Sequence, residues 1–166
     1  MPVNNPAEVF VLLLSDVRRK TERSTEFFTA LSEFADEPEI KEALAARAFV
    51  TEKSLQKIDQ VFNLINQKPV ELTGRLEEIF VEDFRREVAE IKAPIARRLF
   101  VLAKLMHLTH LRIGEYQMLV AAADLTGHFG VGVLLESCLA DNQAFVERTR
   151  RIITRIAEVK TAKAAP

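Results

Sequence analysis

Turn-forming residues are scarce and widely spaced in this chain, and their spacing is the feature that most restricts its fold. Among 166 residues there are five glycines and six prolines. Long segments lie between them, in which apolar residues recur every three to four positions, the period of an α-helix with one buried face. No segment has the apolar–polar alternation, bounded by turn-forming pairs, that indicates a β-strand. The sequence therefore predicts an all-α protein.

Four long helices and one short helix are expected from these periodic segments. The first helix has a clear start, because Asn5, Pro6 and Glu8 match an N-cap, a proline in the first turn and a capping-box acid. The long helices are expected at about residues 6–35, 38–65, 94–125 and 131–159, with the short one at about 74–92. A long helix spans about 45 Å at 1.5 Å per residue. We expect a ferritin-like antiparallel four-helix bundle with the short helix in a crossover between the second and third long helices.

One domain accounts for the periodic part of the chain. Residues 1–159 are expected to form the helical bundle. Apolar periodicity is lost in residues 160–166, which we expect to be a disordered C-terminal tail.

Charge and cysteine content narrow the classes of function. Lys and Arg total 23 against 24 acidic residues, a formal net charge of −1, so overall charge does not favour nucleic acid or an anionic membrane. The apolar run at residues 9–14 is much shorter than the ~20 residues of a membrane span. The single cysteine, Cys138, excludes an intramolecular disulfide and a cysteine-based metal cluster, and we expect it to be a buried, inert thiol in a cytoplasmic protein. No nucleic-acid or membrane partner is expected.

Two local clusters of basic residues interrupt this balanced composition. They are residues 18–20 and the arginines between 148 and 155, and glutamates are interleaved with both. We interpret them as a solvated face or as a network of ion pairs between helices.

The ligand pattern of a ferritin-like metal centre is missing from the chain. Such a centre takes a Glu from each of two helices and a Glu-x-x-His pair from each of the other two. The residue three positions before each histidine is not an acid: it is Lys104 for His107, His107 for His110 and Leu125 for His128.

Several segments nevertheless resemble a known family. Residues 37–44, followed by Thr51-Glu52 and residues 59–62, resemble the second helix of the YciE/YciF-type ferritin-like family. Residues 109–116 resemble its third long helix, and the overall resemblance spans about residues 8–156. It implies a ferritin-like bundle, often dimeric and linked to bacterial stress responses.

The chain departs from this family where its acids and histidine would bind metal. Thr21 stands at the position of the first-helix Glu, Ser54 at that of a His, and Thr109 and Arg112 at those of two acids. A run of glutamates in the last helix becomes residues 140–143, which contain one acid. The resemblance thus implies a metal-free polar core made of the following residues: Thr21, Glu52, Thr109, His110, Arg112 and Tyr116.

Arg112 decides the electrostatics of this expected core. Arginine does not deprotonate in proteins, and a unit charge 4 Å from a dication costs about 8 kcal/mol at an effective dielectric constant near 20. A buried arginine also needs a partner, so we expect Arg112 to pair with Glu52 or another acid. The alternative is that Arg112 lies on the surface.

The sequence favours a non-catalytic, stress-associated protein with a structural or interaction role, without a cofactor and as a homodimer by default. Two alternatives remain open. One is an oxidoreductase with a degenerate iron or manganese site at Glu22, Glu52, His110 and Asp141. The other is a small-molecule binding protein, in which the vacated core cavity takes an apolar or anionic ligand near Arg112.

Overall fold

Five α-helices make up the computed structural model, which describes residues 3–35, 37–72 and 75–164 and has no strand within these ranges. The helices are α1 (Pro6–Glu33), α2 (Pro38–Leu64), α3 (Arg75–Glu90), α4 (Pro94–Leu125) and α5 (Phe129–Ala164). The all-α prediction is therefore confirmed. Among the described residues, no helix has the length and apolarity needed to cross a membrane.

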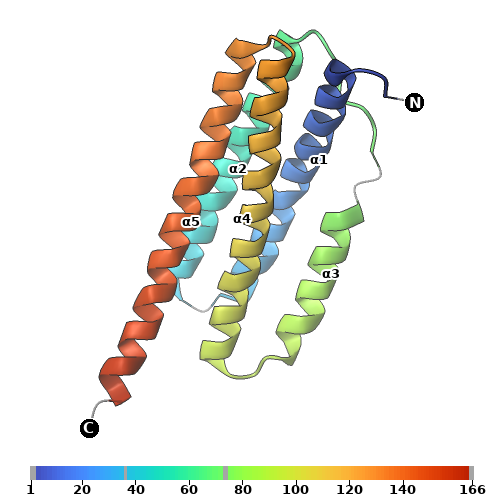
Figure 1. Ribbon diagram of the computed structural model, residues 1–166. Coiled ribbons are helices and arrows are strands. Elements are labelled where there is room, and N and C mark those ends of the chain that lie inside the picture. Colours follow the sequence, from blue (N-terminus) through green and yellow to red (C-terminus); the bar gives the residue numbers. More distant parts are fainter. Residues whose placement is uncertain (1–2, 36, 73–74, 165–166) are drawn as a thin grey trace.

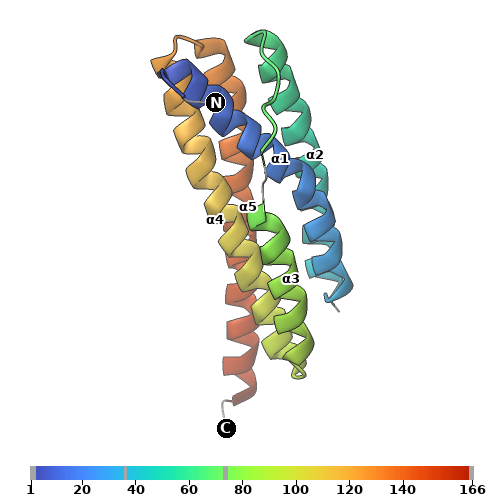
Figure 2. The ribbon, with the colours of Figure 1, turned by 90° about the vertical axis from the view of Figure 1, so that its right-hand side faces the viewer.

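The four long helices form two antiparallel hairpins, α1–α2 and α4–α5, as Figure 1 shows. The connection from α2 to α4 runs back along the bundle and contains α3, which lies against α1 and α4 over half of the bundle's length (Figures 1 and 2). Each long helix packs against two antiparallel neighbours, since α1 also contacts α4 and α2 also contacts α5. This is the predicted bundle with a short helix in its crossover.

Local sequence signals explain where the helices begin and end. The Asn5 side chain accepts a hydrogen bond from the Glu8 amide at 2.9 Å, which confirms the predicted N-cap of α1. Gly127 adopts a φ of 76° after α4, and the His128 amide then donates to the Ala123 carbonyl at 2.8 Å. A non-glycine residue would be strained there, so Gly127 sets the tight turn into α5.

The end of α5 differs from the prediction. This helix begins two residues before the expected residue 131 and its backbone continues to Ala164, beyond the boundary at 159. Alanine and lysine are strong helix formers, so loss of apolar periodicity in residues 160–164 does not end the helix. Residues 165–166 of the expected tail lie outside the described residues.

The interior of the bundle contains two apolar clusters. The phenylalanine cluster includes Phe27, Phe28, Phe84 and Phe145, and it is the one that buries α3 against the bundle. The second cluster, at the opposite end, is built from the first half of α1, the second half of α2, the last part of α4 and the start of α5. Between the two clusters the inward-facing residues are polar, and this layer is the candidate site.

Candidate functional site

A layer of buried polar side chains crosses the middle of the bundle, and every long helix contributes to it. All its members have an exposed fraction of 9% or less. They are Lys20, Thr21 and Ser24 from α1, Arg47, Thr51 and Ser54 from α2, Thr109 and Arg112 from α4, and Asn142 from α5. We call this set the polar layer.

The hydroxyl groups of the polar layer are bonded within their own helices. Thr21, Thr51 and Thr109 each donate a hydrogen bond to the backbone carbonyl four residues earlier, at 2.7, 2.9 and 2.8 Å. Ser24 and Ser54 do the same at 2.7 and 3.0 Å. These protons are therefore committed to the backbone, and the interactions between helices depend on the charged and amide groups.

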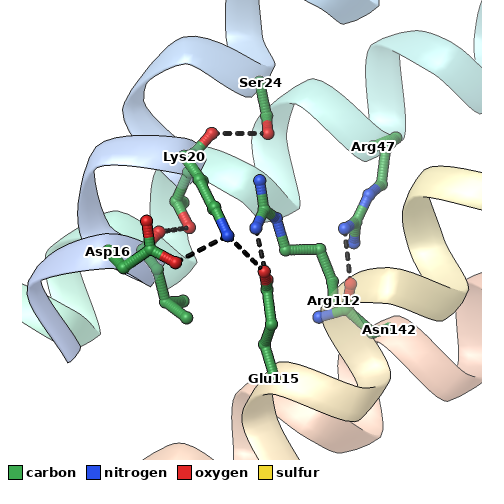
Figure 3. A network of polar contacts seen from close by, with 9 residues as sticks. Asp16, Lys20, Ser24, Arg47, Arg112, Glu115 and Asn142 are labelled. Atoms are coloured by element: carbon green, nitrogen blue, oxygen red, sulfur yellow. Dashed lines mark hydrogen bonds and ion pairs between the residues drawn. The ribbon is translucent and has the colours of Figure 1, made fainter. Parts of the chain in front are cut away.

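On the side of α1 and α4, the buried cations have carboxylate partners. Arg112 is 6% exposed and pairs with Glu115 one turn along α4. Glu115 also accepts from Lys20 Nζ at 2.7 Å, and Lys20 contacts Asp16 at 2.6 Å (Figure 3). Burial lowers the pKa of Lys20, but the hydrogen bonds that Lys20 donates to Asp16 and Glu115, with the attraction of these two charges, outweigh it and leave the pKa above its ordinary value. We call these four residues the carboxylate side.

On the side of α2 and α5, a second arginine is buried without a carboxylate bonded to it among the described residues. Arg47 is 5% exposed, and its Nη2 donates to Asn142 Oδ1 at 2.5 Å (Figure 3). Its guanidinium carbon lies 5.5 Å from the Phe28 ring centroid and 5.2 Å from that of Phe145. In the described structure Arg47 Nε and Nη1 make no hydrogen bond. We call Arg47, Asn142 and the two rings the aromatic side.

Arg47 keeps its charge despite this environment. Burial lowers its pKa to about 10, which still leaves the guanidinium protonated at neutral pH. The positive charge of Arg112 also lowers the pKa of Arg47, so the two arginines repel each other across the layer.

Two neutral groups border the polar layer. Burial raises the pKa of Tyr116 above its ordinary value and does the same for the Cys138 thiol, so neither ionises near neutral pH. Cys138 is fully buried, as the sequence predicted. The Tyr116 hydroxyl is buried and makes no hydrogen bond of ordinary geometry to a described residue, with the Thr21 side chain as a near neighbour.

A small space lies within the polar layer. Its walls are Thr21, Ser24, Arg47, Thr51, Ser54, Arg112, Tyr116 and Asn142. It has room for about one water-sized molecule. The two arginines and the Tyr116 hydroxyl thus border a space too small for an organic ligand.

The structure places only part of the predicted polar core inside the bundle. Thr21, Thr109, Arg112 and Tyr116 are buried in or beside the polar layer. Arg112 is therefore not on the surface, and its acid is Glu115.

Glu52 and His110 are corrections to the predicted core. Both are exposed, although Thr51 and Thr109, directly before them, are buried. One residue along an α-helix turns a side chain by about 100°, which carries both groups from the core to solvent.

The alternative ligand set is also not assembled. The side chain of Glu22 is 58% exposed, because Thr21 takes the inward position on α1. Asp141 is half-buried and pairs with Lys57 at 3.0 Å, because Asn142 takes the inward position on α5. With Glu52 and His110 exposed as well, the four proposed ligands do not face a common point.

The charged part of the layer was missed from the sequence. Arg47, Asn142 and Glu115 were not singled out. Lys20 was placed in a basic cluster interpreted as a solvated face or an interhelical ion-pair network; it is buried, and its contact with Glu115 of α4 agrees with the second interpretation. For Arg47 a signal exists, since it lies at helical spacing between Leu44 and Thr51 on the buried face of α2.

Three other residues of the basic clusters make ion pairs between helices. Arg18 contacts Asp59 of α2 at 2.6 Å, and Arg148 contacts Glu42 at 3.1 Å. Arg155 of α5 contacts Glu39 at 2.5 Å. These pairs agree with the interpretation as an interhelical network.

The donor set of the layer does not fit a dinuclear iron or manganese centre. Such ions need several carboxylate ligands. None of the residues that line the central space is an acid, and the part of the chain that the structure describes has no group of three or more His, Cys, Asp or Glu placed to hold a metal. Two guanidiniums border the space instead, and each would repel a dication by about 8 kcal/mol at 4 Å and an effective dielectric constant near 20.

Comparisons with known proteins agree with this architecture. The family model described as "Domain of unknown function (DUF892)" matches residues 5–163. The crystal structure of the E. coli stress protein YciF is similar with a TM-score of 0.88 and 22% identity, over 94% of this chain and 99% of that one. YcfI from Rhodopseudomonas palustris, provisionally described as a structural protein, is similar with a TM-score of 0.84 and 20% identity, over 89% of this chain and 94% of that one. No curated protein matches significantly.

A third solved structure is more distant. A protein from Xanthomonas campestris pv. campestris has a TM-score of 0.67 and 18% identity, over 95% of this chain and 99% of that one. At these identities the structural likeness concerns the fold, and it confirms the helical bundle. The family match and the likeness to YciF confirm the resemblance noted in the sequence.

Proposed function

This chain belongs to the DUF892 family, and we propose that it is a non-catalytic helical-bundle protein with a structural or interaction role. The observation that carries the proposal is the pair of buried arginines, Arg47 and Arg112, in the middle of the bundle. A ferritin-like bundle performs metal chemistry with carboxylates at this level. Here guanidiniums and backbone-bonded hydroxyls take that place, so the residues that line the central space supply neither the carboxylate ligands of such a centre nor a carboxylate base.

An association with stress is part of the proposal. It is supported by the similarity to YciF, which is described as a stress protein of E. coli. We also propose a cytoplasmic location, for which the support is the single cysteine, buried as a free thiol.

We further propose that the protein is a homodimer. Leu111, Met118 and Leu125 are 36%, 60% and 74% exposed and follow one another at intervals of seven residues on α4, so they share one outer face. Phe129 and Val133 of α5 are exposed as well. A stripe of this kind suits a self-complementary two-fold contact.

Sedimentation equilibrium of the full chain tests the dimer. The wild type is expected at twice the monomer mass, and Met118→Glu is expected to shift it toward the monomer. Gln117→Glu is the matched control, because Gln117 is exposed beside the stripe. A wild type that sediments as a monomer contradicts the dimer.

Metal loading tests the metal-free core. The purified chain is incubated anaerobically with Fe²⁺ or Mn²⁺, desalted and subjected to elemental analysis. We expect close to zero ions per chain, because the central space has cationic walls. One or two ions per chain would overturn the proposal, and Glu52→Gln and His110→Ala would then show whether the alternative site holds them.

A further inference from the structure

Arg47 leaves an uncompensated positive charge in the interior of the bundle. Near the polar layer, Lys20, Arg47 and Arg112 are positive, and Asp16 and Glu115 pair with Lys20 and Arg112. Both carboxylates are engaged on the carboxylate side. Arg47 is left with one neutral amide acceptor and two aromatic rings.

Arg47, whose Nε and Nη1 make no hydrogen bond in the described structure, is one of the walls of the central space. The exposed fraction of Arg47 is 5%. The Tyr116 hydroxyl, another wall of the same space, is a second buried donor without an ordinary hydrogen bond to a described residue. Burying N–H and O–H groups without acceptors is unfavourable, because such groups lose their hydrogen bonds to water and gain none in the protein.

The occupant that would satisfy these groups must be small, and it must accept hydrogen bonds. The Thr21, Thr51 and Ser54 hydroxyl protons are bonded to backbone carbonyls, so these hydroxyls cannot donate into the space. The buried donors that lack an acceptor are those of Arg47 and Tyr116, and Arg47 carries a positive charge. A carboxylate or phosphate is too large for a space of about one water-sized molecule. A water molecule fits but leaves the charge in place.

We propose that the central space binds a single monatomic anion, chloride, between the guanidinium of Arg47 and the hydroxyl of Tyr116. The inference rests on the proposed function, because it needs a core without a metal centre. It adds a ligand to that core. Ferritin-like metal proteins bind cations through carboxylates in the middle of the bundle, whereas this protein binds an anion there through an arginine.

Anomalous diffraction from crystals grown in sodium bromide tests the site directly. Bromide is a halide close to chloride in size, and it scatters anomalously. We expect one anomalous peak per chain within hydrogen-bond distance of Arg47 Nε or Nη1. A central space with no anomalous peak, or with a water molecule in it, overturns the proposal.

A solution measurement checks that binding does not depend on the crystal. The Tm of the full chain is recorded while sodium gluconate is replaced by sodium chloride at constant ionic strength. We expect a saturable rise of about 3 °C for the wild type. Arg47→Met is expected to abolish the rise, and Arg148→Met, which removes an exposed arginine, is expected to keep it. Coincident gluconate and chloride series for the wild type overturn the proposal.

The two proposals fail in distinguishable ways. An absent halide together with an absent metal removes the anion site and leaves the metal-free bundle intact. Uptake of iron or manganese removes the proposed function itself.

Discussion

Each side of the polar layer buries an arginine, and the two arginines have different kinds of partner. On the carboxylate side, Glu115 lies one turn from Arg112 and also reaches Lys20, so local ion pairs compensate the buried charge. On the aromatic side, Arg47 lies between Phe28 and Phe145 and donates to Asn142. Aromatic rings attract a cation and exclude water, but they neutralise none of its charge. The first side is complete within the chain, whereas the second has room for an external counterion.

The largest effect is expected when the carboxylate side loses its central acid. Glu115→Gln keeps the shape of the side chain but removes the charge shared by Arg112 and Lys20. The free energy of unfolding is expected to fall by about 3–5 kcal/mol, because breaking a buried ion pair leaves charge uncompensated. Urea unfolding measures it, with the exposed Glu22→Gln as the control. Equal stabilities of the two variants would show that the network contributes little.

The difference between the two arginines gives the second prediction. Arg112→Met removes a compensated charge and is expected to lower the free energy of unfolding by about 2–3 kcal/mol. Arg47→Met loses the bond to Asn142 and the contacts with the rings, but it also relieves an uncompensated buried charge. In chloride-free buffer we expect it to cost about 2 kcal/mol less than Arg112→Met.

Urea unfolding of both variants under the same conditions provides the measurement. Equal losses at the two positions would mean that Arg47 is compensated as well as Arg112 is.

These two arginines also show how far the sequence leads. Thr109, Arg112 and Tyr116 are three, four and seven residues apart, and this spacing is enough to place them on one inward stripe of α4. On α2 the apolar residues suggest a stripe through Leu44 and Ala48. The buried face passes through Leu44 and Arg47, and Ala48 is only partly buried.

The reason is that periodicity is read from apolar residues, and the polar layer interrupts them. Where Arg47, Thr51 and Ser54 face inward, the nearest apolar neighbours, Ala48 and Leu55, lie only partly buried beside them. The fold is predictable because the two apolar clusters on either side fix the helices. The composition of the polar layer is not predictable in the same way. An error of one residue in the helical register places Glu52 in the core instead of Thr51, or Asp141 instead of Asn142.

Converting the aromatic side into a second carboxylate side gives the third prediction. Asn142→Asp places a carboxylate where Arg47 Nη2 donates. A charge-assisted hydrogen bond contributes about 1.5–3 kcal/mol, and the lost amide donation to the Cys138 carbonyl costs about 1 kcal/mol. We expect a net gain of about 1 kcal/mol.

The same variant is expected to lose the dependence of Tm on chloride, because Arg47 then has an internal anion. Asp141→Asn is the matched control, since Asp141 pairs with Lys57 on the outer side of the layer. If Asn142→Asp still responds to chloride as the wild type does, the halide is not bound at Arg47.

The smallest expected effect is the pH dependence of the carboxylate side. The pKa of Lys20 is raised above 10.5 in the folded state by Asp16 and Glu115, against the effect of burial. The folded protein therefore binds this proton more tightly than the unfolded chain does. The stabilisation is fully present below pH 10.5 and is lost as the pH rises through the folded pKa. Urea unfolding between pH 9 and 11.5 is expected to show that the free energy of unfolding falls more steeply with pH for the wild type than for Lys20→Met, by about 1 kcal/mol or less.

Burial without a bonded carboxylate lowers the pKa of Arg47, so its contribution to the free energy of unfolding has the opposite sign and rises with pH. Lys20→Met isolates the first contribution, and parallel alkaline curves for the two proteins would show that the carboxylates do not hold the Lys20 proton more tightly than water does.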